Sequence, residues 1–457
     1  MRAGTVTPFF SVLIPTRDRA DLLVDSALRS VLAQTFDDFE VVVCDNASSD
    51  HTRERVSALA DPRVRFVRSE TWIPKEHFFE FALRQARGEY ALLFFDDDYL
   101  TTTAIEIAHR VLRAHPHDVL AFNIYACYFY PDWHLPSQRN VMQLPRFSGE
   151  LRRLESRRHV AEIFARVNLL PESPTVPTIF RTTFIHELMD AHGSLFPHGH
   201  MGDINTAIHV LTRTPTFLFL DCPLALFGHW KNNTTAQLHE FKTTMPEYQE
   251  WIAWFTRTHI ATMPVPAYFW SNCVAATLRD MKRQLDLEPA LEPANYFQAL
   301  HRELQELERH DVDVSVPRRA WLAAIHRLPH ATRAQVVKAL INPEPPQAAP
   351  GTEVLARDVG PRSPVTDRGR VFLKAGDYGV DTMLGAGRLF EKIVAGDVSI
   401  PAGGDDGTPL PSRERFARWL RAHPTCRGAL HAARRALGAG RLRAAAYSAH
   451  RRLSRPR

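Results

Sequence analysis

Three consecutive carboxylates, Asp96, Asp97 and Asp98, directly follow an apolar run at residues 90–95 that is typical of a buried strand. Adjacent carboxylates repel one another and resist dehydration, so the edge of a core tolerates them best when a cation neutralises them. Mg²⁺ and Mn²⁺ prefer carboxylate oxygens and keep other positions for water and substrate phosphates. The triplet therefore predicts a site for one of these metals and a diphosphate. On its own, a solvated acidic turn that caps the next helix would explain it equally well.

The elements that must position the triplet alternate between strand and helix over the first 115 residues. Strands are expected at 9–14, 39–44, 64–67 and 90–95, and helices at 20–34, 50–60, 76–87 and 102–114. This alternation predicts a mostly parallel sheet with helices on its faces, and in such sheets ligands bind beyond the carboxyl ends of the strands. The segments 15–17 and 45–46 fall at those ends, as the Asp triplet does, so we expect the three polar clusters to meet at one edge.

The remaining chain divides by composition. Residues 1–240 are expected to form one α/β domain, and residues 241–342 a mainly helical extension. Residues 343–364 are rich in proline and small residues, which is typical of a linker. Residues 365–457 form a C-terminal region that ends in an Arg-rich tail.

Charge is distributed unevenly along the 457 residues. Residues 410–457 hold thirteen arginines and one acid, or +12, which leaves −7 for the rest of a chain whose net charge is +5. Such a tail suits an anionic membrane surface. Nucleic acid is disfavoured because few aromatic residues are interleaved with the arginines, and a disordered solubilising tail is the remaining alternative.

Three absences in the sequence bear on where the protein is located. No apolar stretch approaches the ~20 residues of a membrane-spanning helix, and the N-terminus lacks the apolar core of a signal peptide. The five cysteines form no C-x-x-C pair, so neither a zinc ribbon nor a disulfide framework is indicated. We expect a cytoplasmic protein that the tail can hold peripherally on the inner face of the cell membrane.

The N-terminal half resembles the family 2 glycosyltransferases of the GT-A fold. The stretches that resemble the family's motifs are 11–19, 30–35, 40–50, 88–98, 193–207 and 221–234. Two departures stand in the first stretch, where the family usually has tyrosine and asparagine and this chain has Arg17 and Asp18. The resemblance implies a GT-A, Rossmann-like α/β fold and transfer of a sugar from a nucleotide-diphosphate donor, with a uridine nucleotide favoured and a glycan or lipid-linked molecule as the acceptor.

The resemblance also implies roles for individual residues. Asp45 corresponds to the position that accepts a hydrogen bond from the nucleobase imide, a task that suits an acceptor-only carboxylate. Asp96 and Asp98 form the D-x-D pair, with Asp98 the metal ligand and Asp96 directed to the ribose or the metal. The nucleotide-binding residues implied in this way are Pro15, Thr16, Arg17, Asp45, Asp96 and Asp97. If the strand stays extended, Asp96 and Asp98 face the same way.

Asp203 is the candidate general base of an inverting transfer, because an attacking hydroxyl must lose its proton as the new bond forms. The family usually has Glu-Asp here, whereas this chain has Gly202 before Asp203. A helix N-cap is the structural alternative for Asp203. His229 and His200 are candidate contacts to the acceptor or the phosphates. A zinc site built from His198, His200 and Asp203 can also be drawn, but without a distant fourth ligand it is thinly supported.

Two other functions compete with this prediction. A nucleotidyltransferase would share the sheet and the metal-bound phosphates, but the loop after the first strand contains no glycine. A catalytically degenerate protein that binds glycan or acts as a scaffold is compatible with the missing acid at Gly202.

Overall fold

The computed structural model describes residues 7–133, 135–195, 201–231, 249, 253, 256–266, 269–309, 313–341, 352–365 and 370–398. The chain folds as two compact units. Unit 1 comprises Met1–Glu162, Leu169–Ile252 and Ala349–Asp406, and unit 2 comprises Ile163–Asn168, Ala253–Ala348 and Gly407–Arg457. The Arg-rich tail and His200 lie outside the described residues, so the predictions made for them stay predictions.

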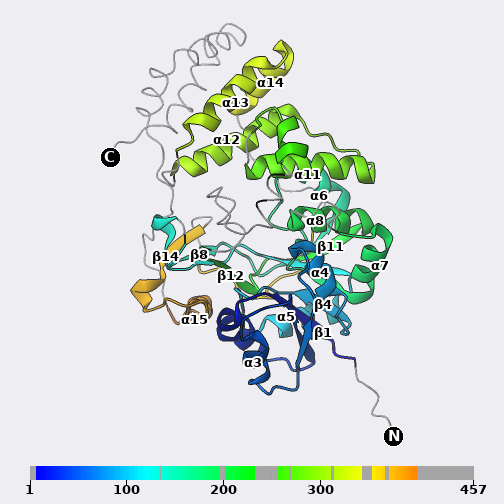
Figure 1. Ribbon diagram of the computed structural model, residues 1–457, viewed down its shortest axis with the longest axis vertical. Helices are drawn as coiled ribbons and strands as arrows, with labels where there is room; N and C mark the ends of the chain where they lie inside the picture. The colour runs from blue at the N-terminus through cyan, green and yellow to red at the C-terminus, as the bar shows by residue number, and fades with distance from the viewer. Residues whose placement is uncertain are drawn as a thin grey trace. The chain divides into compact units, whose positions relative to one another are not determined.

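Unit 1 is built on a mixed sheet of nine strands in the order β13-β9-β11-β6-β10-β4-β1-β2-β3 (Figure 1). Their bounds are β1 Phe10–Thr16, β2 Phe39–Asp45, β3 Val64–Arg68, β4 Tyr90–Leu93, β6 Val119–Phe122, β9 Leu151–Glu155, β10 Ile179–Arg181, β11 Thr216–Leu220 and β13 Glu353–Ala356. The run β3-β2-β1-β4 is parallel throughout, as expected, whereas β10 pairs antiparallel with both β4 and β6. The α/β fold class is thus confirmed, and the sheet becomes mixed beyond β4.

Up to residue 115, the helices of unit 1 follow the predicted alternation: α1 Ala20–Leu22, η1 Leu23–Leu28, α2 Arg29–Leu32, α3 Thr52–Ser57, α4 Lys75–Leu83 and α5 Ala104–Ala114. Further along the chain come α6 Ser156–Arg166, whose last four residues are assigned to unit 2, α7 Thr182–His192 and α8 Gly202–Arg213. The first three form one helical segment, because η1 is a π-helical turn inserted in the helix expected at 20–34. In α5 the apolar residues recur at helical spacing and are buried on one face, which explains why this segment forms a helix.

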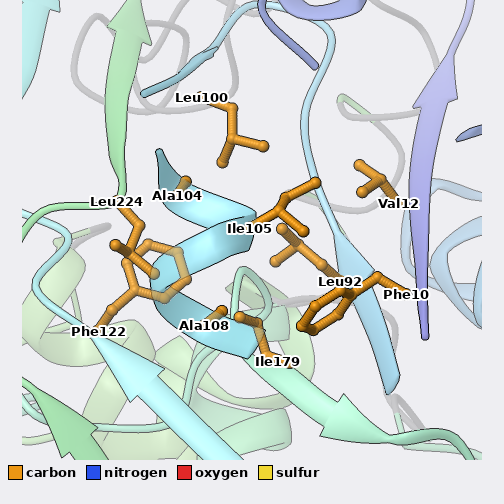
Figure 2. Close-up of a pocket in the computed structure, with 10 residues that line it drawn as sticks. All are labelled: Phe10, Val12, Leu92, Leu100, Ala104, Ile105, Ala108, Phe122, Ile179 and Leu224. Carbon is orange, nitrogen blue, oxygen red and sulfur yellow. The ribbon is translucent and has the colours of Figure 1, made fainter. Parts of the chain in front are cut away.

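One hydrophobic cluster of unit 1 includes the residues between α5 and the main sheet. Val12 of β1, Leu92 of β4 and Ile179 of β10 are register partners, and their side chains point toward Ile105 and Ala108 of α5 (Figure 2). The gap that these side chains leave is lined by apolar residues alone. It offers no polar group to orient a nucleotide, so we interpret it as a packing gap and not as a binding site.

A second sheet in unit 1 has five strands in the order β14-β8-β7-β12-β5. Their bounds are β5 Tyr99–Leu100, β7 Cys127–Phe129, β8 Val141–Pro145, β12 Ala225–His229 and β14 Arg370–Lys374. Strand β5 begins directly after the Asp triplet and pairs antiparallel with β12. This sheet therefore brings residues 225–229 beside the triplet, although more than a hundred positions separate them in the sequence.

Residues 352–398 belong structurally to unit 1. Strand β13, which falls inside the expected linker 343–364, pairs with β9 at the edge of the main sheet, and β14 extends the second sheet. Helix α15 Met383–Ala395 packs on β5 and β12, and it lies next to β14 in Figure 1. Part of the expected linker is thus an edge strand, because four non-proline residues, 353–356, supply a pairing segment within proline-rich surroundings.

Unit 2 is helical, as expected for the region after residue 240. It contains η3 Ile260–Thr262, α11 Trp270–Leu285, α12 Pro293–Arg309, α13 Ser315–Arg327 and α14 His330–Ile341. Trp321 of α13 is buried, and its indole N–H donates to the backbone carbonyl of Phe297 in α12 at 3.2 Å. None of the described helices is long and apolar enough to cross a membrane.

Candidate functional site

The polar residues after β1, β2 and β4 meet at one edge of the main sheet. Thr16 and Asp45, the last residues of β1 and β2, are register partners. The Thr16 hydroxyl donates to Oδ2 of Asp96 at 2.8 Å. The backbone N–H of Asn46 donates to the carbonyl of Thr16 at 2.9 Å. The segment around Thr16 therefore contacts both other clusters that were expected to converge.

Asp96 is held at both carboxylate oxygens. Besides the bond from Thr16, Arg19 donates from Nη1 to Oδ1 of Asp96 at 2.9 Å. Asp96 is 3% exposed, and 26% of the Arg19 side chain is accessible. A charge-assisted bond of this kind is stronger than a neutral one. Arg19 is thus a cation bound to the triplet.

Asp97 is linked to the segment that follows β12. Trp230 donates its indole N–H to Oδ2 of Asp97 at 3.0 Å. The guanidinium carbon of Arg19 lies 4.9 Å from the centre of the Trp230 ring, a cation–π geometry. Trp230 therefore contacts Asp97 and Arg19 together and joins the first loop of the sheet to the triplet.

Among the described residues, only one of the two carboxylate oxygens of Asp98 has a hydrogen-bond partner. The backbone N–H of Gly228 in β12 donates to Oδ1 at 2.9 Å. Oδ2 is buried and has no hydrogen-bond partner among the described residues. An acceptor that is dehydrated and unpaired costs free energy, so this oxygen is suited to a ligand that the protein alone does not supply.

The expectation that Asp96 and Asp98 share one face of an extended strand is wrong. Strand β4 ends at Leu93, and the backbone N–H of Asp98 donates to the carbonyl of Phe95 at 3.3 Å, which closes a turn over the triplet. The carboxylates consequently point to different partners: Asp96 to the loop after β1, Asp97 to Trp230 and Asp98 to β12.

Burial and mutual repulsion disfavour the charged forms of these carboxylates. Burial, followed by the neighbouring Asp96, raises the pKa of Asp97 to about 6, although Arg19 acts in the opposite direction. Burial and the charge of Asp97 raise the pKa of Asp98 well above its ordinary value. A cation beside the triplet would favour the ionised forms and remove this penalty.

These residues fit a divalent metal that is shared with a substrate. Within the described parts of the chain, no three His, Cys, Asp or Glu side chains are arranged as a complete metal cage. Mg²⁺ typically binds through one or two carboxylates and takes its other ligands from water and phosphates. The unpaired Oδ2 of Asp98 supplies such a carboxylate, so the donor set suits Mg²⁺ or Mn²⁺.

Asp45 is more enclosed than a base-binding role suggests. Its side chain is fully buried, and Arg68 at the end of β3 donates to Oδ2 at 2.6 Å. The backbone N–H of Ser48 donates to Oδ1 at 3.3 Å. A carboxylate has about four lone-pair sites, but a nucleobase could reach Asp45 only if Arg68 or this loop moved.

Pro15 is the second-last residue of β1 and is buried, whereas Arg17 faces solvent. The guanidinium carbon of Arg17 lies 5.7 Å from the ring centre of Trp72, and 40% of Trp72 is exposed. The loop that contains Trp72 is fixed by Asn46, whose side chain exchanges two hydrogen bonds with the backbone of Ile73, at 2.7 and 2.9 Å. A planar cation and an aromatic ring therefore stand next to Asp45.

Asp203 is half-buried in the first turn of α8, and Met201, in the left-handed conformation with φ of 64°, is the N-cap. The alternative that Asp203 is the N-cap is therefore wrong, because α8 begins at Gly202, two residues earlier than an N-cap at Asp203 would require. An acid in the first turn also interacts favourably with the helix dipole. A role as general base stays a prediction for Asp203.

His229 is the last residue of β12 and lies between Gly228 and Trp230, which both contact the triplet. Its ring stacks on Phe129 with centroids 4.9 Å apart. The position agrees with a contact to a bound ligand, and that contact stays a prediction.

The sequence-based predictions gave no role to Arg19, Gly228 or Trp230. Arg19 lies within the first stretch of resemblance, 11–19, so its place after the first strand is a signal that could have identified it. Nothing in the spacing of Gly228 or Trp230 indicates the triplet, because only the pairing of β5 with β12 brings them together.

Comparison with known proteins gives one family match. The model of "Glycosyl transferase family 2" matches residues 11–167. This match and the sheet described above together confirm the GT-A fold class expected from the sequence.

Individual relatives match over short segments. The GalNAc(5)-diNAcBac-PP-undecaprenol beta-1,3-glucosyltransferase of Campylobacter jejuni is 33% identical over 101 residues, which are 21% of this chain and 32% of that protein. The UDP-Glc:alpha-D-GlcNAc-diphosphoundecaprenol beta-1,3-glucosyltransferase WfgD of Escherichia coli is 29% identical over 97 residues, 21% of this chain and 38% of that protein. The chain spans less than half the length of these relatives.

Among solved structures, TarS of S. aureus, residues 1–349 in complex with UDP-GlcNAc, is 19% identical with a TM-score of 0.40. The match covers 72% of this chain and 89% of TarS. A likeness at this level indicates no ligand or substrate for the present chain.

Proposed function

This chain belongs to glycosyl transferase family 2 through residues 11–167, and from that premise we propose that it transfers a sugar from a nucleotide-diphosphate donor to a glycan or lipid-linked acceptor, with inversion at the anomeric carbon. The observation on which the proposal depends most is the buried Oδ2 of Asp98, which has no hydrogen-bond partner among the described residues. It lies within a triplet of carboxylates at the ligand-binding edge of the sheet.

The metal would be held by Asp98, with Asp96 beside it. A bound Mg²⁺ or Mn²⁺ would offset the negative charge that builds on the departing diphosphate. Gly228 fixes the orientation of Asp98 through its N–H, and Trp230 does the same for Asp97. These two bonds hold the carboxylates in place before any ligand arrives, which is the preorganisation that a metal site needs.

The base and ribose of the donor would occupy the ends of β1 and β2, beside Pro15, Thr16 and Asp45. A UDP-sugar is favoured because the imide of uracil can donate to a carboxylate such as Asp45. Arg17 and Trp72 stand at the same edge and offer flat surfaces to a base. Since Asp45 is fully buried against Arg68, this arrangement requires Arg68 to shift when the donor binds.

The proton of the attacking hydroxyl would pass to Asp203. In the transfer, the acceptor oxygen forms a bond to the anomeric carbon while the bond to the diphosphate oxygen breaks, and the hydroxyl proton goes to the base. The half-buried position of Asp203 in the first turn of α8 leaves its carboxylate partly accessible to a substrate. His229, next to the triplet, would contact the phosphates or the acceptor.

The proposed acceptor class and the proposed location have more indirect support. The names of two relatives specify undecaprenyl-diphosphate acceptors, and the +12 tail of this chain suits an anionic bilayer surface. Both agree with a role in the synthesis of cell-envelope polysaccharide, on a cytoplasmic protein that attaches peripherally to the membrane.

A panel of nucleotide sugars tests the proposal through thermal stability, because a ligand that binds the native state raises the apparent melting temperature. With Mn²⁺ present, at least one UDP-sugar should stabilise the protein, and EDTA should abolish the shift. The donor would then be incubated alone to detect slow hydrolysis, which separates an enzyme from a degenerate glycan-binding protein. No metal-dependent stabilisation by any nucleotide sugar would contradict the proposal.

A further inference from the structure

We infer that Arg19 is the resident counter-cation of the Asp triplet and that it moves from Asp96 to the diphosphate of the donor when the metal binds. The inference rests on the proposed function and adds to it a residue that binds the donor. In the structure, Arg19 donates to Oδ1 of Asp96 at 2.9 Å and lies on the ring of Trp230 at 4.9 Å.

Arg19 is placed where its charge partly neutralises the negative charge of the triplet. Three consecutive carboxylates are buried to 3%, 8% and 2% exposure, and repulsion between them disfavours the ionised state. One guanidinium offsets a single charge. The triplet therefore stays incompletely neutralised in this state, which leaves it attractive to a second, divalent cation.

A divalent cation bound to the same carboxylates changes the electrostatic potential at the guanidinium of Arg19. Its positive charge takes over the role of Arg19 at Asp96 and repels the guanidinium, since charges a few Å apart in a partly buried site are weakly screened. The diphosphate of the donor arrives with the metal and offers new acceptor oxygens. Guanidinium groups bind phosphate oxygens in bidentate geometry, which suits Arg better than Lys for this contact.

The surroundings of Arg19 allow such a move. About a quarter of the Arg19 side chain is accessible, so the side chain is not enclosed on all sides. The Trp230 ring contacts the cation without fixing a hydrogen-bond direction, while the Trp230 N–H is bonded to Asp97 and holds the ring in place. Arg19 can thus turn on a fixed aromatic surface and exchange one anionic partner for another.

The competing explanation is that Arg19 only pins the loop after β1. The two explanations differ in the sign of one effect. If Arg19 competes with the metal, its removal strengthens binding of the metal alone and weakens binding of the nucleotide with the metal. If Arg19 only maintains the loop, its removal weakens both.

The test is titration calorimetry at pH 8 on the full chain, with Mn²⁺ alone and with UDP in the presence of saturating Mn²⁺. For Arg19→Gln we expect Mn²⁺ alone to bind at least threefold more tightly and UDP to bind at least tenfold more weakly than for the wild type. Arg19→Lys should restore the weaker binding of Mn²⁺ but only part of the UDP affinity, because an ammonium cannot form the bidentate contact.

Arg55→Gln is the matched control. Arg55 contributes the same charge to unit 1, but it pairs with Asp21 and Asp25 on the surface, so both affinities should stay within twofold of the wild type. Equal affinities of Arg19→Gln and the wild type, or weaker binding of both ligands, would overturn the inference while leaving the proposed function intact. A wild-type protein that shows no metal-dependent binding of UDP would reject both.

Discussion

Gly228 donates its backbone N–H to Oδ1 of Asp98 at 2.9 Å across 130 positions of sequence. A methyl group on Gly228 would lie 2.1 Å from the backbone carbonyl oxygen of Asp97. Only glycine at position 228 allows strand β12 to approach the triplet this closely. This close approach connects the second sheet to the candidate metal site.

Gly228→Ala should displace the triplet and weaken binding of Mn²⁺ by more than tenfold, because the added carbon and the Asp97 carbonyl cannot occupy the same space. Overpacking of this kind costs about 1–3 kcal/mol of stability. Calorimetry with Mn²⁺ and UDP measures the loss of binding, and thermal melting measures the loss of stability.

Gly379→Ala is the control for that prediction. Gly379 has φ of +68° and no atom within 4 Å of an added methyl group, so alanine there costs about 1 kcal/mol through backbone strain alone. It should bind Mn²⁺ and UDP as the wild type does. If the two variants lost metal binding equally, the close approach at Gly228 would have no special role.

Asp98→Asn should weaken metal-dependent binding of the nucleotide by more than tenfold, or about 1.4 kcal/mol, because a charged ligand of the metal is lost. Titration calorimetry of UDP with and without Mn²⁺ measures the effect. Asp37→Asn removes a carboxylate that is 93% exposed and should change nothing. Binding that is unaltered in Asp98→Asn and independent of metal would refute the role given to Asp98.

Glu391 of α15 joins residues 352–398 to the segment between β5 and α5. Its Oε1 accepts from the backbone N–H and the hydroxyl of Thr102, at 2.6 and 2.7 Å. Because hydrogen bonds to a charged group contribute about 1.5–3 kcal/mol, Glu391→Ala should lower the stability of unit 1 by that amount. Urea unfolding followed by tryptophan fluorescence would measure the change.

Glu353→Ala is the control variant for Glu391→Ala. Glu353 lies in the same C-terminal segment, but it forms an exposed ion pair with Arg153, which contributes at most about 1 kcal/mol. A similar loss of stability for the two variants would show that Glu391 does not have the anchoring role described here.

His209 should make stability depend on pH. It is fully buried in α8, and neither ring nitrogen has a hydrogen-bond partner among the described residues. Burial, with a smaller effect of the charge on His192, lowers the pKa of His209 to about 4. Between the unfolded value of about 6.5 and this native value, the unfolded state binds the proton and the native state does not, so stability falls as the pH decreases.

The expected loss from His209 approaches about 3 kcal/mol over that interval, and it vanishes above pH 6.5 and levels off below pH 4. Melting temperatures of the wild type should therefore fall more steeply between pH 6.5 and 4.5 than those of His209→Gln. His326→Gln, at an exposed position on α13, should retain the wild-type pH dependence. Parallel curves for the wild type and His209→Gln would exclude the effect.

The first half of the fold could be predicted from the sequence because its signals are local. The valine-rich segment that became β2 and the periodic apolar residues of α5 indicate their elements without tertiary information. The carboxyl ends of neighbouring parallel strands must meet, so the proximity of Thr16 to Asp45 and to the triplet also follows.

The remaining features depend on pairing between distant segments. Trp230 reaches Asp97, and Gly228 reaches Asp98, only because β12 pairs with β5. The short strand β13 pairs with β9 at the edge of the sheet, and no local pattern within this proline-rich stretch predicts that pairing. The turn at Asp96–Asp98 likewise depends on partners that pull the three carboxylates apart, so strand alternation gave the wrong orientation for this site.

Release of the nucleoside diphosphate from the stabilising nucleotide sugar tests most directly whether transfer depends on a metal and uses Asp203 as the base. Turnover should require Mn²⁺ or Mg²⁺ and stop with EDTA. In Asp203→Asn it should fall by about 10²–10⁴, while donor affinity by calorimetry stays within a few fold of the wild type. Turnover in EDTA, or near-native turnover by a folded Asp203→Asn protein, would contradict the account.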